Sequence, residues 1–343
     1  MALNSLLRDG LRVLLLSVFT LFACAPSSVS NAPTSRVVVK DAPRRAGVDA
    51  VLVFLPESPH TREAWGTLKD ELANDFDVLT RVVGEDSDES FVRREIEATK
   101  PRGVVLMGNL AMNLYLEYQR RHPGQSFPPA LVVMASFFEQ QRGLFKNTTG
   151  ISYEIPGITT FVSLRSFVYQ PVRRVGVIHR PLFSNYVERQ SRLASVEQVQ
   201  IVRAEVGSAP GPYEIRRAID RLINRDKVDA IWVLNDNVLL EPELIAKGWL
   251  TMLHKNPVLV VVGVGSLVDQ RLHFGSFAML PDHAALGVQT ANLIFKLAEQ
   301  GWNAEKEPVE LPLSIQTVVD LAWTREHFQV REEALERIDR IVQ

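Results

Sequence analysis

The chain has 343 residues, of which 46% are hydrophobic and 23% are charged, and its formal net charge is −2. Such a chain can bury a large core and is long enough for two domains, so the composition excludes a fully disordered protein. The nearly balanced charge provides no basic surface for nucleic acid, and we expect no nucleic-acid partner.

An export signal is predicted at the N-terminus. Arg8 and Arg12 precede an apolar run at 13–23, which has the length of a signal-peptide core and is too short for a comfortable membrane span. The run ends in Leu21-Phe22-Ala23-Cys24, which resembles the lipobox of bacterial lipoproteins, where a lipid is attached to the cysteine and cleavage occurs just before that residue; palmitate is an expected acyl group. Cys24 is the only cysteine of the chain, so no internal disulfide can form.

The sequence therefore predicts a signal peptide at 1–23 and a lipidated, flexible tether at 24–46, which is rich in Ser, Pro and Ala. Ala25, rather than an aspartate, follows the cysteine. The resemblance to Gram-negative lipoproteins implies sorting to the outer membrane rather than the inner one. We expect the protein at the periplasmic face of that membrane, held by the lipid anchor only.

Short apolar runs alternate with amphipathic stretches from residue 50 onward. The run at 50–55 has strand length, and the next segment carries Trp65, Leu68 and Leu72 at helical spacing, with Thr61 as its cap. The alternation predicts further strands at 76–83, 103–107 and 130–134, and further helices at 90–99 and 109–121. Because these strands are apolar on both faces, we expect a parallel sheet between two layers of helices.

The same pattern restarts near residue 174. It predicts strands at 174–179, 199–204, 230–234 and 258–262, and helices from about 185, at 213–225 and at 243–254. A long amphipathic helix is predicted at 282–300, followed by a tail with a strand and short helices. The repeated unit predicts two similar α/β lobes with a cleft between them.

An ordered series of motifs runs through the second part of the chain. The motifs are Asn147-Thr148-Thr149-Gly150-Ile151, Arg173-Arg174-Val175-Gly176-Val177-Ile178, Val228-Asp229-Ala230 with Asn235-Asp236-Asn237, Leu286-Gly287, and Val319-Asp320-Leu321-Ala322-Trp323. In this order and spacing they resemble the ABC transporter substrate-binding protein family related to tryptophan- and tyrosine-binding lipoproteins. The resemblance covers roughly residues 100 to 343 and is clearer over the second lobe.

This resemblance implies a type I periplasmic-binding-protein fold, in which two lobes, each a parallel sheet flanked by helices, are joined by three crossovers near 150, 278 and 309. Lobe 1 then comprises 47–150 and 279–308, and lobe 2 comprises 151–278 and 309–343. The implied function is to enclose a small ligand, such as an amino acid or another small organic molecule, and to deliver it to an ABC importer through its permease. We expect a monomer without a cofactor.

The strongest candidate for ligand binding follows the predicted strand at 230–234. Ligands of open α/β sheets bind at the carboxyl ends of the strands, which is where Asn235, Asp236 and Asn237 lie. The Asp236 carboxylate could pair with a ligand ammonium group, or it could cap the following helix. In the resembled family the comparable aspartate binds ligand, which favours the first interpretation.

Other candidate contacts follow neighbouring predicted strands. Asn109 and Ser136 could bind a ligand carboxylate beside helix N-termini, whose free N–H groups favour anions. Tyr153 and Phe137 are candidate stacking surfaces for a ligand ring. Ser266 follows the predicted strand at 258–262 and completes the expected cleft.

Several alternatives remain open from the sequence. Arg180 could bind an anionic ligand with its planar guanidinium group, or it could be a solvated loop residue. An enzyme is not expected, because the seven histidines show no metal spacing and no nucleotide-binding or hydrolase motif is present; Glu57 with His60 is the best acid–base pair for a hydrolase. A third alternative is a sensory or assembly lipoprotein of the same fold, which signals ligand occupancy to a receptor or histidine kinase.

Overall fold

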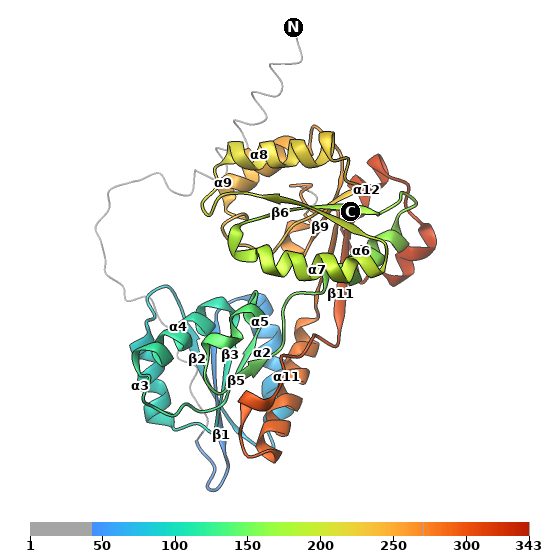
Figure 1. Ribbon diagram of the computed structural model, residues 1–343. Coiled ribbons are helices and arrows are strands. Elements are labelled where there is room, and N and C mark those ends of the chain that lie inside the picture. The colour runs from blue at the N-terminus through green and yellow to red at the C-terminus, as the bar shows by residue number, and fades with distance from the viewer. Residues whose placement is uncertain (1–42, 270, 343) are drawn as a thin grey trace, which may run out of the picture. The chain divides into compact units, whose positions relative to one another are not determined.

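The computed structural model describes residues 43–269 and 271–342 (Figure 1). The predicted signal peptide, Cys24 and nearly all of the predicted tether lie outside the described residues. Within the described ranges, none of the helices combines the length and the apolar character needed to cross a bilayer.

The first sheet has five parallel strands in the order β2-β1-β3-β4-β5. Its strands are β1 (Ala50–Pro56), β2 (Asp77–Val83), β3 (Gly103–Met107), β4 (Ala130–Val133) and β5 (Thr148–Gly150). Its helices are α2 (Pro59–Leu72), α3 (Glu89–Thr99), α4 (Gly108–Arg121) and the short α5 (Phe138–Gln141). The strands and helices predicted up to residue 134 are confirmed, whereas the three-residue β5 was too short to be recognised.

Burial of both faces explains why the strands of this sheet are continuously apolar. Successive side chains of a strand point to opposite faces. In β1, Leu52 and Phe54 join a core cluster with side chains of α3 and α4, while Val51 and Val53 join a second cluster with side chains of α2 and α11 (His283–Glu299). Each apolar residue of β1 therefore has a hydrophobic layer to pack against.

The start of α2 differs from the prediction. Thr61 was expected to cap the helix, but Ser58 occupies the N-cap position and Pro59 is the first helical residue. The Ser58 hydroxyl accepts the Thr61 N–H at 3.1 Å, and the Thr61 hydroxyl accepts the Ser58 N–H at 3.1 Å. The two side chains form a reciprocal capping box, and proline suits the first helical position because its missing N–H has no partner there in any helix.

The second sheet has seven strands in the order β12-β11-β10-β9-β8-β6-β7, and only the β10–β11 pair is antiparallel. Its strands are β6 (Arg174–His179), β7 (Gln200–Glu205), β8 (Ala230–Trp232), β9 (Leu259–Val262), β10 (Phe277–Pro281), β11 (Ile315–Asp320) and β12 (Arg340–Val342). Its helices are α6 (Gly157–Phe167), α7 (Ser184–Val196), α8 (Pro212–Asp220), α9 (Pro242–Leu244), α10 (Leu250–Leu253) and α12 (Leu321–His327). The sequence did not predict β10, β12 or α6.

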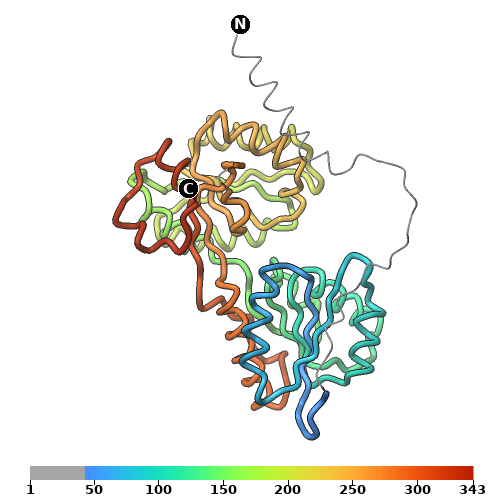
Figure 2. The backbone as a smooth tube through the Cα atoms, turned by 180° about the vertical axis from the view of Figure 1, so that it is seen from behind, coloured from blue at the N-terminus to red at the C-terminus, as the bar shows by residue number. Residues whose placement is uncertain are grey.

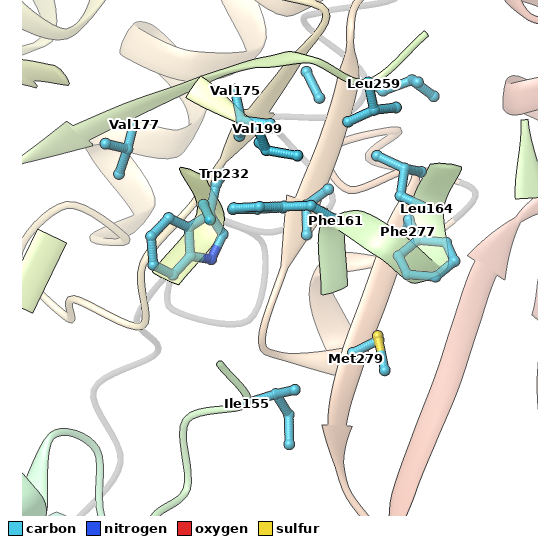
Figure 3. Close-up of a cluster of buried hydrophobic side chains, with 14 of the residues drawn as sticks. Ile155, Phe161, Leu164, Val175, Val177, Val199, Trp232, Leu259, Phe277 and Met279 are labelled. Carbon is cyan, nitrogen blue, oxygen red and sulfur yellow. The ribbon is translucent and has the colours of Figure 1, made fainter. Parts of the chain in front are cut away.

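Two core clusters cover the two faces of this sheet. One contains side chains of α6 and α7, and the other contains side chains of α8, α9 and α10. Figure 3 shows the first cluster, in which the rings of Phe161 and Trp232 lie close together; their centroids are 5.5 Å apart and the rings are nearly perpendicular. The two-lobed α/β architecture expected from the repeated pattern is therefore present, and we call the first sheet with α2–α5 and α11 lobe 1 and the second sheet with its helices lobe 2.

The chain passes between the two sheets three times. It leaves β5 for α6, it leaves β10 for α11, and it returns to β11 past Glu310, whose carbonyl accepts the Ser152 N–H at 2.8 Å. Helix α11 lies along α2, as both views of the chain show (Figures 1 and 2). Gly287 permits this close approach, because a Cβ atom at that position would lie 1.9 Å from the Thr67 hydroxyl.

Candidate functional site

A cavity of about 820 Å³ lies at the carboxyl ends of strands from both lobes. This volume falls within the usual range for small-molecule sites. Both lobes contribute polar side chains to its wall, among them Asn109, Ser136 and Gln140 from lobe 1 and Arg180, Asp236 and Asn237 from lobe 2. The polar strand ends singled out in the sequence therefore do meet in space.

The lobe 1 wall is organised around the end of β4. The Ser136 N–H donates to the Asn109 side-chain oxygen at 2.7 Å, which ties this loop to the start of α4. Gly108, the first residue of α4, has a φ of +80°, a left-handed conformation that glycine adopts without strain. The two residues predicted to bind a ligand carboxylate are thus adjacent and fixed to each other.

Phe137 is placed differently from the expectation of a free stacking surface. Its ring is buried and packs against two aromatic rings of lobe 2, with centroid distances of 4.4 Å to Phe183 and 5.2 Å to Tyr186. Its φ of +57° is uncommon for a bulky residue, and packing must offset the strain. Phe137 lines the cavity, but its larger contact is with the lobe 2 core.

Asp236 forms a bidentate ion pair with Arg180. The Arg180 Nε and Nη2 atoms donate to the two carboxylate oxygens at 2.7 Å each, and the Asp236 side chain is only 2% exposed. The same carboxylate accepts the Val238 N–H at 3.1 Å. The hydrogen bonds to Asp236, together with its negative charge, raise the pKa of Arg180. Asp236 therefore lines the cavity with its charge already balanced, and its contact with a ligand stays a prediction. It holds the turn after β8 but does not cap the following helix, because α9 (Pro242–Leu244) has Glu241 at its N-cap.

The residues beside Asp236 differ in exposure. Asn237 is exposed at the cavity wall, whereas Asn235 is half-buried and packs against the backbone at Gly263. A Cβ atom at position 263 would lie 2.6 Å from the Asn235 side-chain oxygen. The glycine thus makes room for the Asn235 amide at the end of β9.

A buried carboxylate, Glu154, lies in a second cavity of about 20 Å³. That volume is near the minimum for one water molecule. One Glu154 oxygen accepts the Phe137 N–H at 2.9 Å, while within the described residues the other oxygen has no hydrogen-bond partner. Burial raises the pKa of Glu154 to about 7, against the opposing effect of the Phe137 N–H. This carboxyl group is available to a donor that reaches the small cavity.

Two predicted residues lie apart from the large cavity. Tyr153 borders the small cavity, and its hydroxyl forms a hydrogen bond of 3.0 Å with His283 Nε2. Burial raises the pKa of Tyr153 to about 12. Ser266 is exposed in the turn Gly265–Leu267 and lines neither cavity. The structure thus brings together Asn109, Ser136, Phe137, Asn235, Asp236 and Asn237 at the large cavity, and their contacts with ligand stay predictions.

The sequence did not identify Glu154 as a candidate, and it did not decide whether Arg180 binds a ligand or is a solvated loop residue. Glu154 follows β5 in an irregular segment, where neither periodicity nor a motif distinguishes it from a surface acid. Arg180 directly follows β6, so its strand-end position was the available signal. Only the bidentate contact with Asp236 excludes the solvated-loop interpretation.

No known family model matches the chain, and no curated protein matches it. Several solved structures match it in fold. An ABC domain in complex with L-Trp from Streptococcus pneumonia is 17% identical, with 86% of this chain and 100% of that chain covered and a TM-score of 0.58. A conserved domain protein from Vibrio cholerae is 15% identical, with 86% and 99% covered and a TM-score of 0.56.

A substrate-binding protein with adhesive properties from Clostridium difficile, in its ligand-free, open form, is 15% identical. The alignment covers 86% of this chain and 100% of that chain, with a TM-score of 0.63. At these identities the likeness establishes the fold. The chain has the two-lobed type I periplasmic-binding-protein fold of ABC transporter substrate-binding proteins, as its ordered motifs implied.

Proposed function

We propose that the protein is a periplasmic solute-binding protein that encloses a small organic molecule between its lobes. The observation that carries this proposal is the cavity of about 820 Å³, whose wall is built from strand ends of both lobes. A ligand that contacts both lobes favours the arrangement in which all those contacts exist together, so its binding energy drives closure. The protein acts by binding rather than by catalysis.

The side chains of the cavity suit a polar or zwitterionic ligand. Arg180 and Arg189 bring guanidinium groups, Glu139 brings a carboxylate, and Asn109 and Gln140 bring amides. Such groups can replace the water contacts of a charged small molecule while the apolar parts of the wall cover its carbon skeleton. The Streptococcus structure holds L-Trp. Amino acids, aromatic ones first, are therefore the ligand class to test.

The N-terminal signals complete the proposal. Acylation of Cys24 anchors the protein to the periplasmic face of a bacterial membrane, the outer membrane in preference to the inner one. A closed, ligand-loaded monomer then presents both lobes to the permease of an ABC importer. A cysteine-free variant, Cys24→Ala, tests the anchor: we expect the unmodified protein to incorporate radiolabelled palmitate and the variant to incorporate none, and an unlabelled unmodified protein would contradict acylation.

A thermal-shift screen tests ligand binding. The full chain, purified in detergent, is scanned with the common amino acids and with nucleosides as a second chemical class. We expect a concentration-dependent rise in melting temperature for at least one amino acid, because a ligand that binds only the native state stabilises it. Stabilisation by no compound of either class would contradict the proposal.

A pair of variants shows whether a stabilising compound binds in the large cavity. Asn237→Ala removes an exposed amide from the cavity wall, and we expect it to weaken the stabilisation. Asn256→Ala is the matched control, because Asn256 lies in lobe 2 away from the cavity wall. Equal stabilisation of both variants and the unmodified protein would place the compound elsewhere.

A further inference from the structure

Two histidines and a glutamate meet beside the segments that connect the lobes. His60 lies in the first turn of α2, Glu63 follows three residues later in the same helix, and His283 is the first residue of α11. One ligand atom from each of the three side chains lies within 4.8 Å of the other two. We propose that His60, Glu63 and His283 bind a divalent first-row transition metal ion such as Zn²⁺. This site is separate from the proposed ligand cavity and does not depend on it.

The donor set matches this class of metal. Two imidazoles and one carboxylate occur in zinc sites that keep a further position open for water or another ligand. Imidazole donors do not suit Mg²⁺ or Ca²⁺, which prefer oxygen. In a tetrahedral zinc site the donor atoms are roughly 3.3–3.5 Å apart, so shifts of at most about 1.5 Å complete the site. His60 and Glu63 are exposed and can make those shifts by side-chain rotation.

His283 is already oriented for metal binding. Its Nδ1 atom lies 3.8 Å from the Glu63 carboxylate, and its ring centroid is 4.6 Å from that of His60. Its Nε2 atom is held by the Tyr153 hydroxyl at 3.0 Å, and the two rings are stacked with an interplanar angle of 10°. A metal-bound histidine commonly uses its other nitrogen for such a hydrogen bond, which fixes the ring and its tautomer. Tyr153 is therefore a positioning residue.

The electrostatic surroundings keep the imidazoles available. The N-termini of α2 and α11 both point at the site and disfavour a cation, but they also disfavour protonated histidine. The carboxylates of Glu63 and Asp282, the N-cap of α11, offset the helix ends.

Metal binding at this place would connect three separate parts of the chain. His283 directly follows the passage from β10 to α11, Tyr153 lies in the passage from β5 to α6, and His60 follows β1. A bound ion thus fixes the lobe 1 ends of two of the three connections between the sheets. We expect it to stabilise the region about which the lobes move.

Isothermal titration calorimetry with ZnCl₂ tests the proposal. The full chain is purified in detergent without a polyhistidine tag and stripped of metal with a chelator. We expect one equivalent of Zn²⁺ to bind and MgCl₂ at the same concentration to give no signal. Replacing Zn²⁺ by Co²⁺ should give the visible absorption of a tetrahedral cobalt site with histidine ligands. The absence of stoichiometric Zn²⁺ binding to the unmodified protein would overturn the proposal.

Variants separate the site from adventitious binding. We expect His283→Gln to abolish Zn²⁺ binding and the exposed His60→Gln to weaken it at least tenfold, while Tyr153→Phe weakens it about 10–100-fold. His122→Gln, at the C-cap of α4 in the same lobe, is the matched control and should bind like the unmodified protein. If His283→Gln does not fold, as judged by circular dichroism, His60→Gln decides. Unchanged affinity in His60→Gln would overturn the assignment.

Discussion

Asp236 and Glu154 are two buried carboxylates beside the cavities, and they differ in what surrounds them. Asp236 meets the guanidinium group of Arg180 through two hydrogen bonds of 2.7 Å. Glu154 receives one backbone N–H, and one of its oxygens has no partner in the part of the chain that the structure describes. The first carboxylate is paired with a guanidinium group, whereas burial raises the pKa of the second and favours its neutral form.

The comparison shows which of the two carboxyl groups is free to contact a ligand. A ligand cation at Asp236 must compete with Arg180, which is already in place, or contact the pair as a unit. A donor at Glu154 meets an unused acceptor in a space that fits about one water molecule. The positions of Asp236 and Glu154 in the sequence did not reveal this difference. It depends on Arg180, which reaches Asp236 from another segment of the chain and does not pair with Glu154.

The largest effect is expected from breaking the ion pair. Asp236→Ala leaves the Arg180 guanidinium, which is 16% exposed, without its partner and removes the hydrogen bond to Val238. Removal of one member of a buried pair costs about 3–5 kcal/mol, and we expect a loss of this order in the free energy of unfolding, measured in urea. The double variant Asp236→Ala, Arg180→Ala should lose less, because no charge is left unpaired. Equal losses in both variants would show that the unpaired Arg180 guanidinium costs little.

A smaller, pH-dependent effect is expected from Glu154. Its pKa is raised from an ordinary 4.5 to about 7, so between these values the folded protein binds more protons than the unfolded chain. Its contribution to stability is therefore full below pH 4.5 and is lost as the pH rises to about 7, by up to about 3 kcal/mol. Glu139 contributes to the raised pKa through its charge.

Glu154→Gln removes this titration. Urea unfolding of the unmodified protein and the variant from pH 4.5 to 8 measures the difference between the two pH profiles. We expect the variant to gain stability relative to the unmodified protein as the pH rises. Parallel profiles would show that Glu154 titrates near its ordinary value and is well hydrated.

The smallest effect is expected from an exposed carboxylate at the cavity, Glu139. Arg189 of α7 lies 3.9 Å from Glu139, and both side chains are nearly half exposed. Solvated pairs contribute about 0–1 kcal/mol. Arg189→Ala should therefore change the free energy of unfolding by less than about 1 kcal/mol, and added salt should reduce the difference further. A loss comparable to that of Asp236→Ala would mean that water does not reach this part of the cavity.

The elements that could be predicted were those with a strong local pattern. Helix α11 (His283–Glu299) was expected at 282–300, and β9 (Leu259–Val262) at 258–262, because an apolar stripe or a continuous apolar run of sufficient length needs no knowledge of its partners. Strand β10 was not predicted. Its five residues are apolar, but a short apolar run between a glycine-containing turn and a helix does not reveal whether a neighbouring strand exists, and the antiparallel partner β11 lies far along the chain.

The sequence allowed us to predict that the candidate residues lie at strand ends, but it did not predict the contacts that their side chains make. Asn235, Asp236 and Asn237 were placed at a strand end, and the structure brings them to a cavity with Asn109 and Ser136. Phe137 was predicted to stack on a ligand ring, which stays a prediction; it lines the cavity, and its ring also packs against those of Phe183 and Tyr186. A side chain after a strand can turn into the cavity or into the neighbouring lobe, and only packing decides between the two.

The sequence by itself determined the alternation of buried strands and amphipathic helices, because burial on two faces imposes a local apolar pattern, and it determined which polar residues end the strands. The tertiary structure decided which of those residues find partners. The Arg180–Asp236 pair, the hydrogen bond from the Phe137 N–H to Glu154 and the contact of His60 with His283 all join segments distant in sequence. Such contacts depend on distances of a few ångströms between packed elements, which no local pattern of residues specifies.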